Sequence, residues 1–116
     1  MAKIAEEATI EQGSGNVYAD LGMPDAEEMF AKAQLVTAIG KAIQRRGLKQ
    51  DVAAHVIGIE QNELSEILKG QFRDISGERL IEFLNLLGQD VFITIVPHLP
   101  EDGQRGDLRV TWSQSA

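Results

Sequence analysis

The sequence predicts a mainly α-helical protein of four to five helices, followed by a C-terminal β-strand or β-hairpin. Three observations lead to this fold class. Apolar residues recur at three- and four-residue spacing between residues 30 and 87, which is the spacing of one helix face. Glycines divide this stretch into segments of helix length. The spacing then changes to two in the β-branched and aromatic run 91–96, which is typical of a strand.

The composition limits the classes of protein to which the chain can belong. Its 116 residues suit one domain, and its lack of cysteine excludes disulfide frameworks, thiolate nucleophiles and cysteine-bound zinc. No apolar run approaches the roughly 18 residues of a membrane helix. We therefore expect a cytoplasmic protein with no membrane partner and no cofactor.

The net charge of −7 is unevenly distributed and, on its face, argues against a nucleic-acid partner. Residues 1–30 contain one base and seven acids, whereas residues 31–88 contain eight bases and seven acids. The acidity therefore belongs mainly to the N-terminal segment and does not exclude nucleic acid from the middle of the chain. We predict an acidic, mobile arm over 1–22, a helical domain over 23–88 and a β element over 89–116.

The first helix is predicted to begin near Asp25, which can cap it, with Glu28 three residues later. It is predicted to end at Gly47. Its apolar stripe is expected to comprise Phe30, Ala33, Val36, Ile39, Ala42 and Ile43.

Two short apolar-periodic segments follow between Leu48 and Gly70, and Gly58 separates them. Two helices of about eight residues joined by a turn with glycine are the layout of a helix-turn-helix. Ser76 can cap the next helix, which is apolar over more than half of its circumference and is expected to end at Gly88. Such a helix is predicted to be buried centrally, partly against a second subunit.

The β element leaves two interpretations open. Residues 91–96 can pair with residues 108–112 as a hairpin within one chain, or with a second chain across a two-fold axis. Pairing between chains would cover both apolar faces and close the open edge, so we predict a homodimer in which this element forms the interface.

Particular residues of the helix-turn-helix segment carry a family resemblance. The small Ala54 stands where the two helices approach, Gly58 supplies the turn, and Ile59, Leu64 and Ile67 are spaced apolar anchors. In these residues the sequence resembles the lambda-repressor/Cro-like (XRE-type) helix-turn-helix regulators. Over about residues 16–97 it also looks like a subgroup of small bacterial regulators that are often antitoxins.

The chain departs from the family pattern at two helix starts. Lys49 stands where the family usually has a capping Ser or Thr, and Glu60 stands where it tends to have a short capping residue. Each change is expected to weaken a helix start by at most ~1 kcal/mol.

A helical wheel of the second motif helix, with about 100° per residue, identifies the residues available to DNA bases. Opposite the buried face of Leu64 and Ile67 lie polar residues suited to base edges, and we predict that they read bases. These residues are Gln61, Asn62, Ser65 and Glu66. Alternatively, they are ordinary solvated residues, and Glu66 pairs with Lys69 or Arg73 rather than with a cytosine amino group.

The expected phosphate contacts lie at the margins of the motif. The resemblance implies that Gln50, which opens the first motif helix, bonds a phosphate and supports Gln61 from behind. The candidate basic contacts, each of which can instead be a simple surface charge, are Arg45, Arg46, Lys49, Lys69 and Arg73.

The sequence does not indicate catalysis. His55 and His98 are far apart and, without cysteine, form no metal set, and no serine lies in a nucleophile elbow. We predict no enzyme but a DNA-binding transcriptional regulator, most simply a repressor. The alternatives are an antitoxin that neutralises a basic toxin by protein binding, and a helical adaptor that has lost DNA binding.

Overall fold

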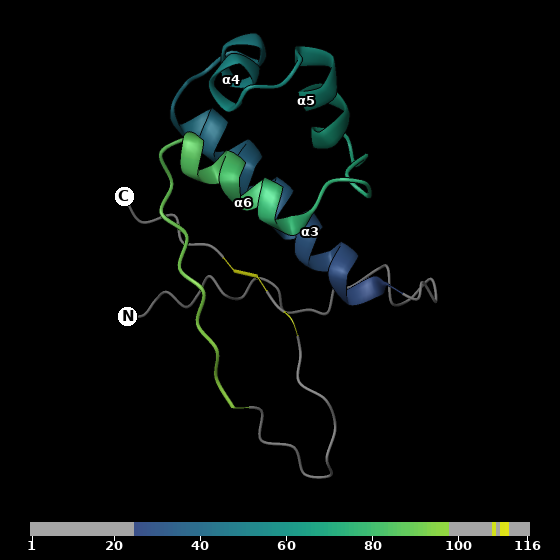
Figure 1. Ribbon diagram of the computed structural model, residues 1–116. Helices are drawn as coiled ribbons and strands as arrows, with labels where there is room; N and C mark the ends of the chain where they lie inside the picture. The colour runs from purple at the N-terminus through teal and green to yellow at the C-terminus, as the bar shows by residue number, and fades with distance from the viewer. Residues whose placement is uncertain (1–24, 98–107, 109, 112–116) are drawn as a thin grey trace. The chain divides into compact units, whose positions relative to one another are not determined.

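The computed structural model describes residues 25–97, 108, 110 and 111 and contains four α-helices in this part of the chain (Figure 1). They are α3 (Ala26–Arg45), α4 (Gln50–Ile57), α5 (Gln61–Leu68) and α6 (Gly77–Leu86). The predicted N-terminal arm over 1–22 lies outside the described residues, as do His98 and most of residues 98–112.

The chain divides into two compact units. One is Lys32–Ile93, which holds most of α3 and all of the other three helices. The second combines Met1–Ala31 with Thr94–Ala116, and few of its residues are described. All of the packing considered below, apart from the first turns of α3, belongs to Lys32–Ile93.

The core of Lys32–Ile93 draws on all four helices. In both figures α6 runs alongside α3. The most completely buried large side chains are Ile39, Leu64, Ile67, Leu80, Phe83 and Leu87, and α4 adds Ala53, Ala54 and Ile57. The apolar face of α6 is buried through Leu80, Phe83 and Leu84, whereas its opposite face is exposed and Leu86 is about half exposed.

The apolar stripe of α3 differs from the predicted one in its first half. Val36, Ile39, Ala42 and Ile43 are buried as expected, whereas Phe30 and Ala33 are only half-buried. The buried positions there are Met29, Ala31, Lys32, Gln34 and Leu35. Because two of these buried residues are a lysine and a glutamine, the spacing of apolar residues alone does not identify this face.

All four helices end in the same way, at the glycines that the sequence indicated. At the end of α4, Gly58 has a left-handed backbone with φ of 82°. Its N–H donates to His55 O, and the N–H of Ile59 donates to Ala54 O at 3.0 Å, which is the bonding pattern of a Schellman motif. The same pattern follows the other three helices, with positive φ at Gly47, Gly70 and Gly88.

The starts of α4, α5 and α6 also match the predictions. Ser76 caps α6, because its Oγ accepts a hydrogen bond from the N–H of Arg79 at 3.0 Å. Lys49 and Glu60 occupy the N-cap positions of α4 and α5 with extended backbone, and neither side chain makes a capping hydrogen bond. Two helices of only eight residues therefore begin without a side-chain cap.

The predicted strand over 91–96 is not formed in the described part of the chain. Residues 91–97 carry no regular secondary structure, nor do Leu108, Val110 and Thr111. Phe92 is 86% exposed and Ile95 is 90% exposed. The sequence has strong strand propensity here, but a strand exists only when its backbone groups pair with a neighbour. A pattern within one segment cannot show whether the chain supplies that neighbour.

Candidate nucleic-acid interface

The helix-turn-helix is formed by α4, the turn at Gly58 and α5. The small Ala54 is buried, as expected where the two helices approach. Leu64 and Ile67 fix α5 to the body of the domain, with 0% and 1% of their surfaces exposed. Gly40 of α3 also lies close to α5, because a Cβ at this glycine would stand 3.8 Å from Leu68 Cδ2. One face of α5 is thus held firmly.

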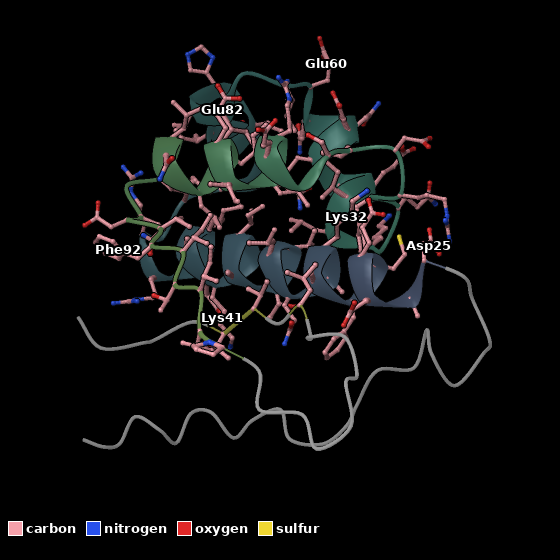
Figure 2. All side chains as sticks on the ribbon, turned by 60° about the horizontal axis from the view of Figure 1, so that its bottom comes forward. Asp25, Lys32, Lys41, Glu60, Glu82 and Phe92 are labelled. Carbon is pink, nitrogen blue, oxygen red and sulfur yellow. The ribbon has the colours of Figure 1, made fainter. Side chains whose placement is uncertain are left out.

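The opposite face of α5 is open to solvent. Gln61, Asn62 and Glu66 are exposed and Ser65 is half-buried, so the structure brings the predicted base-reading residues together on one face of one helix. Glu60, the residue before the helix, projects away from the body (Figure 2). Such a helix, fixed on one side and polar on the other, can enter a major groove without rearrangement.

The predicted phosphate contacts lie at the ends of these helices. Gln50 is the first residue of α4 and is half-buried. The remaining candidates are all exposed, and they follow or precede helix ends; they are Arg45, Arg46, Lys49, Lys69 and Arg73. Lys69 and Arg73 follow α5, Lys49 precedes α4, and Arg45 and Arg46 lie at the end of α3.

Arg46 has a structural contact that the sequence did not reveal. Its Nη1 donates a hydrogen bond to Leu87 O at 3.2 Å. Leu87 follows the last turn of α6, where backbone carbonyls lack partners within the helix. The guanidinium group therefore joins the C-terminal ends of α3 and α6.

The electrostatics of the motif are not those of a strongly basic surface. Between residues 49 and 74, three basic and five acidic side chains are exposed. The acids are Asp51, Glu60, Glu63, Glu66 and Asp74. Phosphate attraction is consequently modest, and affinity for a nucleic acid is expected to depend largely on base-specific contacts.

Comparison with known proteins agrees with this geometry. A family described as a helix-turn-helix domain matches residues 17–96. The chain belongs to this helix-turn-helix family. A solved structure titled "Putative XRE Family Transcriptional Regulator" is 36% identical in sequence to this chain, with a TM-score of 0.66. The match covers 75% of this chain and 97% of that one. No match was found among curated proteins.

Membership in this family bears on two of the predictions, that the chain is no enzyme and that its central motif binds DNA. The family is one of DNA-binding regulators of the XRE type and is not enzymatic, which confirms the interpretation of the chain as a non-enzyme and of its central motif as a DNA-binding domain. In the described residues of the helix-turn-helix protein, no helix has the length and apolar character needed to cross a bilayer.

Lys32 is the residue of this region that sequence reasoning missed. It is only 6% exposed, and its Nζ donates a hydrogen bond to Arg73 O at 2.9 Å. The only sequence signal is its position, because Lys32 lies three and four residues before Leu35 and Val36 and thus on the buried face of α3.

Proposed function

We propose that this helix-turn-helix protein is a sequence-specific transcriptional repressor that places α5 in the major groove of its operator. The observation that carries the proposal is the contrast between the two faces of α5. Leu64 and Ile67 are fully buried, whereas Gln61 and Asn62 are exposed in the first turn of the helix. N-terminal residues of a recognition helix are those that reach base edges.

The chemistry of the open face suits the reading of bases. The side-chain amides of Gln61 and Asn62 can each donate to and accept from adenine, and Ser65 can bond to several bases. Glu66 is an acceptor for a cytosine amino group. The exposed basic side chains at the helix ends bind the DNA backbone phosphates. Gln50, at the start of α4, also hydrogen-bonds a phosphate. Occupation of the operator then blocks transcription in the cytoplasm.

The repressor acts as a homodimer in this proposal. Phe92 and Ile95 are strongly exposed, as are Ile93 and Val96 between and beside them. Four consecutive or near-consecutive large apolar side chains on an extended segment are costly to leave in water. Pairing of 91–96 with the same segment of a second copy would bury them and would place two α5 helices on paired half-sites.

Protein binding is the second candidate function, favoured by the charge of the N-terminal segment. Residues 1–30 contain seven acids and one base, which suits a basic protein partner better than phosphate. An antitoxin would use such a surface to neutralise a toxin and could still regulate its own gene. A toxin-like reading frame beside the gene, and a stable complex of the two proteins, would support this function.

Selection of bound duplexes from a random DNA pool tests the main proposal, followed by footprinting of the recovered site at low and moderate salt. We expect a palindromic motif whose two half-sites are protected together, with protection lost as salt rises. Recovery of no common sequence, with no protection at low salt, would refute sequence-specific DNA binding.

A further inference from the structure

Lys32 stands out because its charge is buried on the inner side of a helix. Figure 2 shows its side chain on the side of α3 that faces the other helices, whereas Lys41 lies on the opposite side of the same helix. A buried ammonium group persists only where hydrogen bonds replace its water. Its bond to the backbone oxygen of Arg73, at 2.9 Å, joins residues 41 positions apart in the sequence.

The carbonyl that Lys32 binds belongs to the loop at the C-terminal end of α5. This loop begins with the Schellman motif at Gly70 and continues into a turn in which the N–H of Ile75 donates to Phe72 O at 3.2 Å. Phe72 is buried and anchors the loop to the core of the domain. Arg73 follows it within the turn, with its side chain exposed and its backbone oxygen held from inside by Lys32.

We infer that Lys32 is a positioning residue for DNA binding, which acts by fixing the turn that presents Arg73 to a phosphate. Lys32 cannot itself serve as the phosphate contact, since only 6% of its surface is exposed. Its hydrogen bond is charge-assisted and therefore stronger than a bond between neutral groups. It restrains the backbone of Arg73 before DNA binds. The loop therefore loses less conformational entropy on binding, and the affinity is higher.

This role rests on the proposed function, but it concerns a residue outside the exposed motif. The hydrogen bond to Arg73 O explains why a charged group is tolerated at this buried position of α3. An apolar residue at position 32 would fill the space and leave the carbonyl of Arg73 without its donor. The domain would then fold with a loosened turn beside α5.

A double-mutant cycle tests the inference. Lys32→Met keeps the stem of the side chain and removes the donor, and Arg73→Ala removes the expected phosphate contact. For each variant and for the double variant, affinity for the selected operator is measured over a range of salt concentrations. We expect Lys32→Met and Arg73→Ala each to reduce the salt slope by about 0.9, the value of one phosphate, and the double variant to lose no more than either one.

Lys41→Met is the matched control, because it removes the same charge from the opposite side of the same helix. We expect it to leave the slope nearer to wild type than Lys32→Met does. Exchange of the Ile75 amide with deuterium provides a readout without DNA, and we expect it to accelerate in Lys32→Met alone. If Lys32→Met does not fold, Lys32→Leu, which also removes the donor, takes its place in the cycle.

Three results would overturn the inference. They are a wild-type salt slope in the Lys32 variant, losses that add in the double variant, or equal effects of Lys32→Met and Lys41→Met. Failure of the proposed function has a different signature, because the wild-type protein would then show no salt-dependent preference for any selected duplex. The Lys32 inference fails alone when wild type binds its operator and the cycle shows no coupling.

Discussion

The guanidinium group of Arg46 donates a hydrogen bond from Nη1 to the backbone oxygen of Leu87, at 3.2 Å. This bond ties the residue after α3 to the residue after α6. Leu87 is fully buried, and Gly88 then leads the chain toward the exposed apolar segment 91–96. The bond thus holds the C-terminal end of α6 against the end of α3.

Replacement of Arg46 by alanine is expected to destabilise the domain, because the carbonyl of Leu87 loses its donor. The bond involves a charged group but lies near the surface, so we expect a loss of about 1 kcal/mol in the free energy of unfolding. Urea denaturation measures the change, with Arg45→Ala as the control for loss of a neighbouring exposed arginine. Equal stabilities of the two variants would show that the bond to Leu87 contributes nothing.

A side chain at Gly58 is expected to destabilise the domain through the backbone conformation alone. Its φ of 82° lies in the left-handed region, and a Cβ there would have no neighbour within 4 Å. Gly58→Ala therefore reports only the strain, about 1–2 kcal/mol in the free energy of unfolding. Gly77→Ala is the opposite control, because Gly77 opens α6 with space around it and without positive φ. We expect it to stabilise the protein, and destabilisation by both changes would contradict this account.

Glu60 offers a way to separate helix capping from charge. Glu60→Ser supplies the capping oxygen that α5 lacks, whereas Glu60→Ala removes the same charge without a cap. We expect the serine variant to be more stable than the alanine variant by about 1 kcal/mol. Both variants lose an acid beside the base-reading face, so both should bind DNA more tightly than wild type at low salt. Equal melting temperatures would show that a serine at this position does not cap α5.

Much of this architecture could be predicted because its determinants are local. A glycine after each helix, a serine before α6 and the spacing of Leu64 and Ile67 all act within a few residues of the chain. A helical wheel was therefore sufficient to identify the open face of α5. The missing caps at Lys49 and Glu60 were equally visible, since a cap depends on one side chain.

The features that escaped prediction depend on contacts between distant residues. The bonds of Lys32 to Arg73 and of Arg46 to Leu87 each span 41 positions in the sequence. In both bonds the acceptor is a backbone oxygen. Every residue carries one, so the sequence does not indicate which of them is bound. The strand over 91–96 was predicted from propensity, but a strand requires a partner whose presence no single segment can encode.

Base reading and phosphate binding are expected to respond differently to substitution. Gln61→Ala and Asn62→Ala should each cost about 1–3 kcal/mol on the preferred operator and relax the preference at the bases they contact. Lys69→Ala should instead weaken binding to all duplexes alike and reduce the salt slope by about 0.9. Competition between the selected operator and scrambled DNA distinguishes the two effects. Unchanged selectivity in Gln61→Ala would show that α5 does not read bases through this residue.

Dimerisation through 91–96 is expected to depend on side chains that the single chain leaves in water. Ile95 is 90% exposed, so Ile95→Asp removes no contact within the described part of one chain and should not affect the stability of the helical domain. Between two copies, however, it would place two carboxylates in an apolar interface, at a cost of several kcal/mol. We expect sedimentation to give a dimer for wild type and a monomer for Ile95→Asp.

A chain that ends after Gln89 should also sediment as a monomer, because it lacks the whole apolar segment. Gln44→Glu is a suitable control, since it adds one exposed acid to α3 and keeps segment 91–96 intact. It should remain dimeric. A dimer that persists in the truncated chain would place the interface outside 91–96 and refute dimerisation through this segment. If Ile95→Asp alone remained dimeric, the segment would pair with Ile95 facing solvent, because alternate side chains of a strand point to opposite faces.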